Sequence, residues 1–91
     1  MNYLVYDLGW LEKGKVVEVT LSAQANVKLM SALDYSYYQK GQRHSYYGGW
    51  VKVSPYRIEI PTSFQHWYVT VDLGGYEGKV SASCTVLSDR E

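Results

Sequence analysis

Alternation of apolar and polar residues with a period of two is the feature that most constrains the fold of this chain. Residues 15–22 and 25–31 each place every second, apolar side chain on one face of an extended strand. Val, Ile, Thr and Tyr, which favour strands, are frequent in these runs. The predicted inward residues of the two runs are Val17, Val19, Leu21, Ala25, Val27 and Leu29, with Met30 on the outer face. A period of two, rather than three to four, predicts an all-β domain.

Short alternating runs elsewhere raise the number of predicted strands to about eight. They cover residues 3–7, 43–47, 50–53, 56–60, 66–73 and 80–86. The last two runs predict Trp67, Val69, Val71, Leu73, Val80, Ala82, Cys84 and Val86 inside, with His66, Tyr68, Thr70 and Asp72 outside. Turns rich in Gly, Pro and Ser link the runs, which predicts a compact antiparallel sandwich or a jelly-roll-like small barrel. Residues 34–40 are the exception, because Asp34 can cap one or two helical turns that end at Gly41.

Length and charge limit the classes of protein to which the chain can belong. Its 91 residues predict a single domain over residues 1–91. Nine Lys and Arg residues balance nine Asp and Glu residues, which argues against a protein that binds duplex nucleic acid. Cys84 is the only cysteine, so no internal disulfide forms and a cytoplasmic location is expected. No signal peptide and no transmembrane segment are predicted.

The sequence predicts no catalytic site, cofactor or metal site. His44 and His66 are the only histidines, and they are predicted on different strands and opposite sides of a sheet. The expected core position of Cys84 disfavours a reactive thiolate. No nucleophile, phosphate-loop or dinucleotide motif is present. One alternative is a calcium site at one end of the sandwich, formed by Asp7, Glu12, Asp72 and Glu77.

Residues 35–57 form an aromatic and basic run that is the main candidate for function. The run holds half of the aromatic residues of the chain and no acidic residue. Its basic side chains are Lys40, Arg43, His44, Lys52 and Arg57. Aromatic rings beside cations can stack on a planar ligand and hold a negative charge. No role is predicted for Tyr35, Tyr37 and Tyr38 within the run.

A hairpin turn at Gly48 and Gly49 divides this run into an inner and an outer set. Because Val51 and Val53 are expected in the core, the alternation sends His44 and Tyr46 inward as well. Across the turn at Ser54 and Pro55, the same rule buries Tyr56, Ile58 and Ile60. The outward residues, and so the predicted ligand-binding residues, are Arg43, Tyr47, Trp50, Lys52 and Arg57. A purely structural role stays open, since cross-strand aromatic pairs also stabilise sheets.

Several phrases of the sequence are specific when they are taken together. They are YDLG at residues 6–9, GKVVEVTLS at 14–22, ANVKLM at 25–30, YYGG at 46–49, Ser54-Pro55 and HWYVTVD at 66–72. With these phrases the chain resembles a family of small bacterial proteins of unknown function, whose members stand alone or are joined to TIR domains. The resemblance implies a compact, mostly-β domain with a sensing or interaction role. It supplies no catalytic residue.

The expected function is therefore a non-catalytic ligand-binding or sensing module of a bacterial cytoplasmic protein. The aromatic and basic residues favour an anionic or nucleotide-like ligand. The alternative is a structural or assembly module that uses the same residues to contact another protein or a second copy of the chain. The expected partner is thus a small anionic ligand or a protein.

Overall fold

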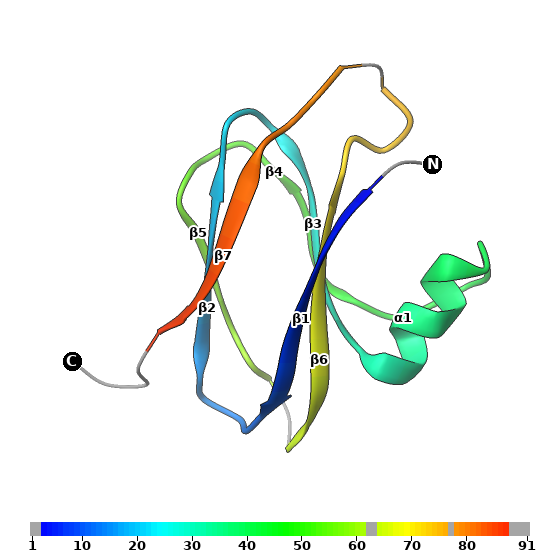
Figure 1. Ribbon diagram of the computed structural model, residues 1–91, viewed down its shortest axis with the longest axis vertical. Helices are drawn as coiled ribbons and strands as arrows, with labels where there is room; N and C mark the ends of the chain where they lie inside the picture. Colours follow the sequence, from blue (N-terminus) through cyan, green and yellow to red (C-terminus); the bar gives the residue numbers. More distant parts are fainter. Residues whose placement is uncertain (1–2, 62–63, 77, 88–91) are drawn as a thin grey trace.

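The protein folds into two antiparallel sheets packed face to face, with one short helix outside them (Figure 1). The computed structural model describes residues 3–61, 64–76 and 78–87. Within these residues the elements are β1 (Tyr3–Leu11), β2 (Val16–Leu21), β3 (Ala25–Ser31), α1 (Ala32–Gln39), β4 (Tyr47–Val51), β5 (Tyr56–Glu59), β6 (Gln65–Asp72) and β7 (Ala82–Leu87). One sheet has the strand order β1-β6-β3-β4 and the other β5-β2-β7. The predicted all-β sandwich is confirmed, with seven strands in the described residues instead of about eight.

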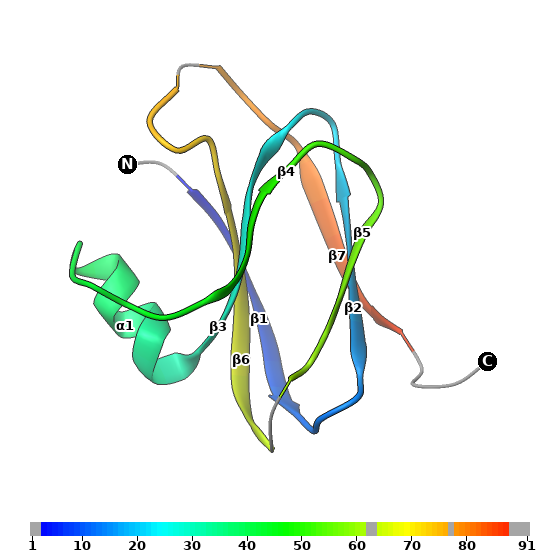
Figure 2. The ribbon, with the colours of Figure 1, turned by 180° about the vertical axis from the view of Figure 1, so that it is seen from behind.

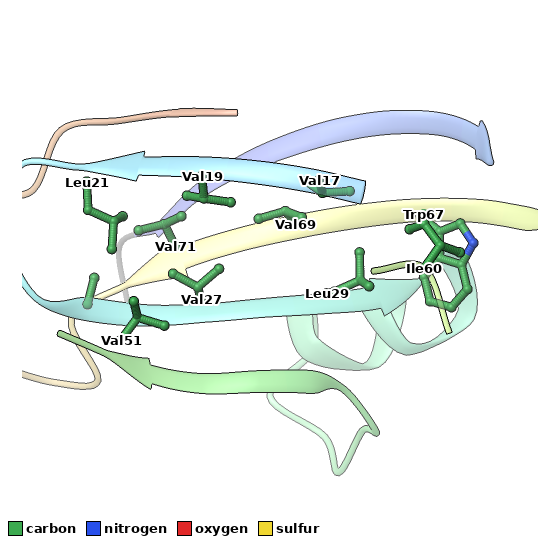
Figure 3. Packing of buried hydrophobic residues seen from close by; sticks show 11 residues of the cluster. Val17, Val19, Leu21, Val27, Leu29, Val51, Ile60, Trp67, Val69 and Val71 are labelled. Atoms are coloured by element: carbon green, nitrogen blue, oxygen red, sulfur yellow. The ribbon is translucent and has the colours of Figure 1, made fainter. Parts of the chain in front are cut away.

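The core lies between the two sheets and follows the predicted alternation (Figure 3). Val17 and Val19 of β2 face Val69 and Val71 of β6, and all four side chains are fully buried. Ala25, Val27 and Leu29 of β3 are equally buried, and Ile60 closes the core near Trp67. Tyr56, Ile58, Leu73, Val80, Ala82 and Cys84 pack around this centre as partly buried residues. These positions confirm the inward predictions for β2, β3, β5 and β6, whereas Val86 of β7 stays exposed.

Helix α1 covers part of the outer face of the four-stranded sheet, which the alternation does not predict. The helix contacts β3 and β6 and lies beside them in both views (Figures 1 and 2). Met30, Thr70 and Asp72 were predicted outside but are buried, because α1 packs on this face, where Tyr38 donates a hydrogen bond to Asp72. The helix confirms the expected helical turns, although its cap is Ser31, whose Oγ accepts from the Asp34 amide at 3.4 Å.

Tyrosines without a predicted role form the contact between α1 and the sheet. The Tyr35 ring stacks on Tyr68 of β6 with 4.4 Å between ring centroids. Tyr38 meets Tyr3 of β1 edge to face at 5.0 Å. Burial is the main cause that raises the pKa of Tyr35 to about 12. Packed aromatic pairs of this kind hold the short helix in place.

The predicted hairpin at Gly48 and Gly49 is wrong. Both glycines lie inside β4 and pair with β3, Gly48 opposite Lys28 and Gly49 opposite Val27. A Cβ atom on Gly48 would lie 2.2 Å from the Val27 carbonyl oxygen, and the φ of this glycine is +115°. Close approach of two strands, and not a turn, is therefore what requires glycine here. In place of the two predicted strands 43–47 and 50–53 there is one strand, β4, which covers only Tyr47–Val51.

The loss of the hairpin changes which side chains near β4 are inside. Tyr46 was predicted inward but is exposed, and His44 lies in the segment before β4 between the rings of Tyr38 and Tyr46. Val51 is buried as predicted. Val53 is 66% exposed, because β4 has already ended at Val51. The alternation thus holds within β4 and fails on both sides of it.

Candidate functional site

The candidate site is an open pocket at one end of the sandwich. Its walls come from the turn between β2 and β3, the end of β4 and the loop between β6 and β7, which all lie at the top of Figure 1. The pocket has a volume of about 860 Å³, within the usual range for small-molecule sites. Its lining includes Gln24, Trp50, Lys52, Leu73, Tyr76 and Lys79. We call this the Trp50 pocket.

Trp50 is held at the pocket by contacts on several sides. It lies opposite Asn26 in the pairing of β3 with β4, on the outer face of the sheet. The indole Nε1 donates a hydrogen bond to Oε1 of Gln24 at 3.0 Å. The ring meets Tyr76 at 5.9 Å between centroids and 64° between planes. Because Trp50 is 41% exposed and Tyr76 is 74% exposed, both rings offer apolar surface to a ligand.

Two lysines line the same pocket as these rings. Lys52 follows β4, and Lys79 lies in the loop before β7. Both lysines are exposed, and no described residue of the lining is acidic. Flexible lysine side chains can place their charge against an anion while the neighbouring rings stack on its apolar part. The arrangement can therefore hold a molecule that has a planar ring and a negative charge.

Of the five predicted ligand-binding residues, the structure brings only Trp50 and Lys52 together in this pocket. Tyr47 lies opposite Leu29, on the inner face of the sheet, and its ring is beside Trp67 of the core. Arg43 belongs to the exposed segment before β4 and does not line the pocket. Arg57 lies in the other sheet, where its Nη2 is 2.9 Å from Oε2 of Glu18. The predicted set of five is therefore split among four parts of the molecule.

Tyr76, Lys79 and Gln24 are pocket residues that the sequence reasoning missed. Tyr76 and Lys79 follow Gly74 and Gly75 in a loop whose sequence indicates a turn between strands. No local sequence pattern predicts that this loop lies beside Trp50. A second pocket of about 720 Å³ lies against the same loop and shares Leu73, Tyr76 and Lys79 with the first. The loop is thus a common wall of two pockets.

Both histidines and Cys84 lie outside the pocket. His66 Nε2 lies 2.6 Å from Oδ1 of Asp7, and this hydrogen bond is the main cause that lowers the pKa of Asp7. His44 Nε2 lies 3.5 Å from the Lys28 ammonium group. Burial raises the pKa of the Cys84 thiol to about 11, so a thiolate is disfavoured at neutral pH.

The four carboxylates of the calcium alternative do not form one cluster in the part of the chain that is described. Asp7 is bound to His66 and Gly9, whereas Asp72 accepts hydrogen bonds from Tyr38, Asn26 and Gly74. Glu77 lies outside the described residues. Among residues 3–61, 64–76 and 78–87, no group of three His, Cys, Asp or Glu side chains is placed to hold a metal ion.

Comparison with known proteins places the chain in a family. No curated protein and no solved structure matches it. No helix among the described residues has the length and apolar character needed to cross a membrane. One family model, described as a domain of unknown function (DUF1883), matches residues 1–90, which confirms the resemblance to a family of unknown function. The chain therefore belongs to the DUF1883 family.

Proposed function

We propose that this protein is a non-catalytic binding module whose Trp50 pocket takes a small anionic ligand with a planar ring, such as a nucleotide. The observation that carries the proposal is that two aromatic residues, whose rings contact each other, and two lysines line one open pocket. The rings come from Trp50 and Tyr76, and the charges from Lys52 and Lys79. The pocket volume of about 860 Å³ accommodates a molecule of this size.

The ring and the charge of the ligand are expected to contribute unequally to the binding free energy. Stacking of a base on an aromatic side chain contributes about 1 to 3 kcal/mol. An exposed ion pair contributes only about 0.2 to 1 kcal/mol and is screened by salt. The planar ring therefore supplies most of the affinity, and the charge adds a smaller, salt-dependent part. Stacking and two ion pairs together supply at most about 5 kcal/mol, which corresponds to a dissociation constant of about 0.2 mM or weaker for a mononucleotide.

The biological setting of the proposal is a sensing or interaction module in the bacterial cytoplasm, including an association with TIR domains. Its support is the resemblance of the sequence phrases to a bacterial family. The single cysteine, Cys84, also suits a reducing compartment. In such a module, ligand binding at the Trp50 pocket would change the interaction with a partner protein and would not lead to a chemical step.

Isothermal titration calorimetry with AMP and its two halves, adenosine and inorganic phosphate, tests the proposal. We expect AMP to bind more tightly than either half. Only AMP has a base that can stack on the aromatic rings and also a phosphate that can pair with the lysines. Lys52→Gln and Lys79→Gln should each weaken AMP about two- to fivefold and leave adenosine unchanged. Arg57→Gln is the matched control, because Arg57 pairs with Glu18 in the other sheet. If AMP gives no heat at millimolar concentration, or if Arg57→Gln weakens it as much as Lys52→Gln does, the proposal is wrong.

The alternative function, assembly through the strand that carries Trp50, has one observation in its favour. β4 is an edge strand of its sheet, and both Trp50 and Tyr47 on it are about 40% exposed. A second copy of the chain or another protein could pair with this edge. Measurement of the mass in solution separates the two functions. A dimer that dissociates on Trp50→Glu supports assembly, whereas a monomer at high concentration contradicts self-assembly.

A further inference from the structure

Asp72, the last residue of β6, has a buried carboxylate that joins three elements of the fold. Asp72 is only 2% exposed to solvent. Oδ2 accepts a hydrogen bond from the Tyr38 hydroxyl of α1 at 2.6 Å. Oδ1 accepts one from Asn26 Nδ2 of β3 at 3.1 Å and one from the Gly74 amide at 2.8 Å. A buried carboxylate with three donors is well satisfied, and the loss of any donor is costly.

The two donors on Oδ1 are the groups that lie directly behind Trp50. Asn26 is the residue opposite both Asp72 and Trp50 in the pairing of the strands. A Cβ atom on Gly74 would lie 2.9 Å from Asn26 Nδ2 and 3.9 Å from Cζ3 of the Trp50 ring. Gly74 thus lies close to both the Asn26 amide and the indole ring. Hydrogen bonds therefore lead from Tyr38 of the helix through Asp72 to Asn26 and Gly74, which neighbour Trp50.

We infer that Asp72 and Tyr38 are positioning residues of the Trp50 pocket, which they hold in shape from behind and link to helix α1. The inference rests on the proposed function for its biological meaning. Asp72 fixes Gly74, and with it the start of the loop that carries Tyr76 and Lys79 to the pocket. Tyr38 keeps the carboxylate buried and oriented, because it is the donor on the oxygen that does not face the loop. Displacement of the helix would therefore disturb the pocket, and a partner that binds α1 would change ligand affinity.

Removal of the Tyr38 hydroxyl would leave the Asp72 carboxylate with two arrangements, and both are unfavourable. Oδ2 would be left buried without its donor, at a cost comparable to a lost charged hydrogen bond. Rotation of the carboxylate toward water relieves this cost but breaks the bonds from Oδ1 to Asn26 and Gly74. Burial, followed by the hydrogen bond to Asp72, raises the pKa of Tyr38 above the ordinary tyrosine value, so the hydroxyl keeps its proton well beyond the physiological range.

Tyr38→Phe and Tyr35→Phe form a matched pair of variants for the test. Both remove one hydroxyl from the same helix, but the Tyr35 hydroxyl contacts only Tyr3 at 3.4 Å among the hydrogen bonds described. Two NMR signals of the ligand-free protein are followed, the Gly74 amide and the Trp50 indole N–H. We expect Tyr38→Phe to speed solvent exchange of the Gly74 amide about fivefold or more and to shift the Trp50 indole. Tyr35→Phe should leave both signals unchanged.

The indoles of Trp10 and Trp67 serve as internal references, because neither lines the Trp50 pocket. The inference is overturned if Tyr38→Phe leaves both signals in place, or if Tyr35→Phe moves them equally, which would mean a general loosening of α1. With AMP as the probe, Tyr38→Phe should weaken binding about three- to tenfold and Tyr35→Phe less than about twofold. If AMP does not bind the unmodified protein, the proposed function fails, and the two ligand-free signals still decide the positioning role.

Discussion

Replacement of Gly48 by Ala should destabilise the protein much more than the same change at Gly49. Both glycines have positive φ values, +115° and +149°, so both variants bear the strain of a side chain in this region. Only at Gly48 would the new Cβ atom meet backbone, 2.2 Å from the Val27 carbonyl oxygen, while nothing lies within 4 Å of the Cβ built on Gly49. The clash can be relieved only if β3 and β4 separate.

The expected loss in the free energy of unfolding has two parts, backbone strain in both variants and the steric clash in Gly48→Ala. Backbone strain for a non-glycine residue costs about 1 to 2 kcal/mol in each variant. The clash at Gly48 should add about 2 kcal/mol or more, because it disrupts pairing in a packed sheet. Urea unfolding followed by Trp fluorescence measures the difference. With an m-value of about 1 kcal/mol per molar urea, the Gly48→Ala midpoint should fall about 2 M below that of Gly49→Ala.

Equal midpoints for the two variants would refute this reasoning. Equal loss is the result expected for a two-residue turn at Gly48 and Gly49, where both residues need positive φ and neither approaches another strand. The pair of variants therefore tests the corrected position of β4, on which the placement of Trp50 depends. A variant at Gly75, which also has positive φ and open space around its Cβ, provides a second reference for strain alone.

Three further predictions follow from burial and from the titratable groups. Leu29→Ala should cost about 2 to 5 kcal/mol in urea unfolding because Leu29 is fully buried, whereas Leu33→Ala on the exposed side of α1 should cost less than about 0.5 kcal/mol. Cys84 should react slowly with a thiol reagent at pH 8 in the folded protein and rapidly in urea, because burial raises its pKa to about 11; equal rates would contradict this. The pKa of Asp7 is lowered in the folded protein, chiefly by His66, so its stabilising effect is present above the ordinary Asp pKa and is lost as pH falls through the lowered value. Asp7→Asn should therefore flatten the fall of the urea midpoint between about pH 5 and pH 2, and an unchanged slope would exclude this contribution.

The sandwich could be predicted from the sequence because its core residues alternate without interruption. Val17 and Val19, like Val69 and Val71, face the core in strands that need no information beyond their own pattern. Met30 and Thr70 could not be placed in the same way. They are buried by a helix that packs on the outer face, and a pattern within one strand carries no information about what covers its second face.

Only the part of the candidate site whose residues are close together in the sequence could be predicted. Trp50 and Lys52 lie two residues apart and share one pocket. Tyr76 and Lys79 reach it through a loop between β6 and β7, whose path depends on the order of strands in the sheet. Gly48 shows the limit most clearly. A glycine pair between strand residues is compatible with a turn and with close strand approach, and only the pairing with Val27 and Lys28 distinguishes them.

The most direct test of the central claim is a titration with AMP that follows the three Trp indole N–H signals by NMR. The Trp50 signal, assigned with Trp50→Phe, should shift in a saturable way, because its indole lies in the pocket and donates to Gln24. Trp67 in the core and Trp10, which stacks on Phe64, should not move. The shift should weaken with added salt, in keeping with the two lysines. A Trp50 signal that stays in place at millimolar AMP, or a shift of all three indoles together, would contradict the assignment of this pocket as a ligand site.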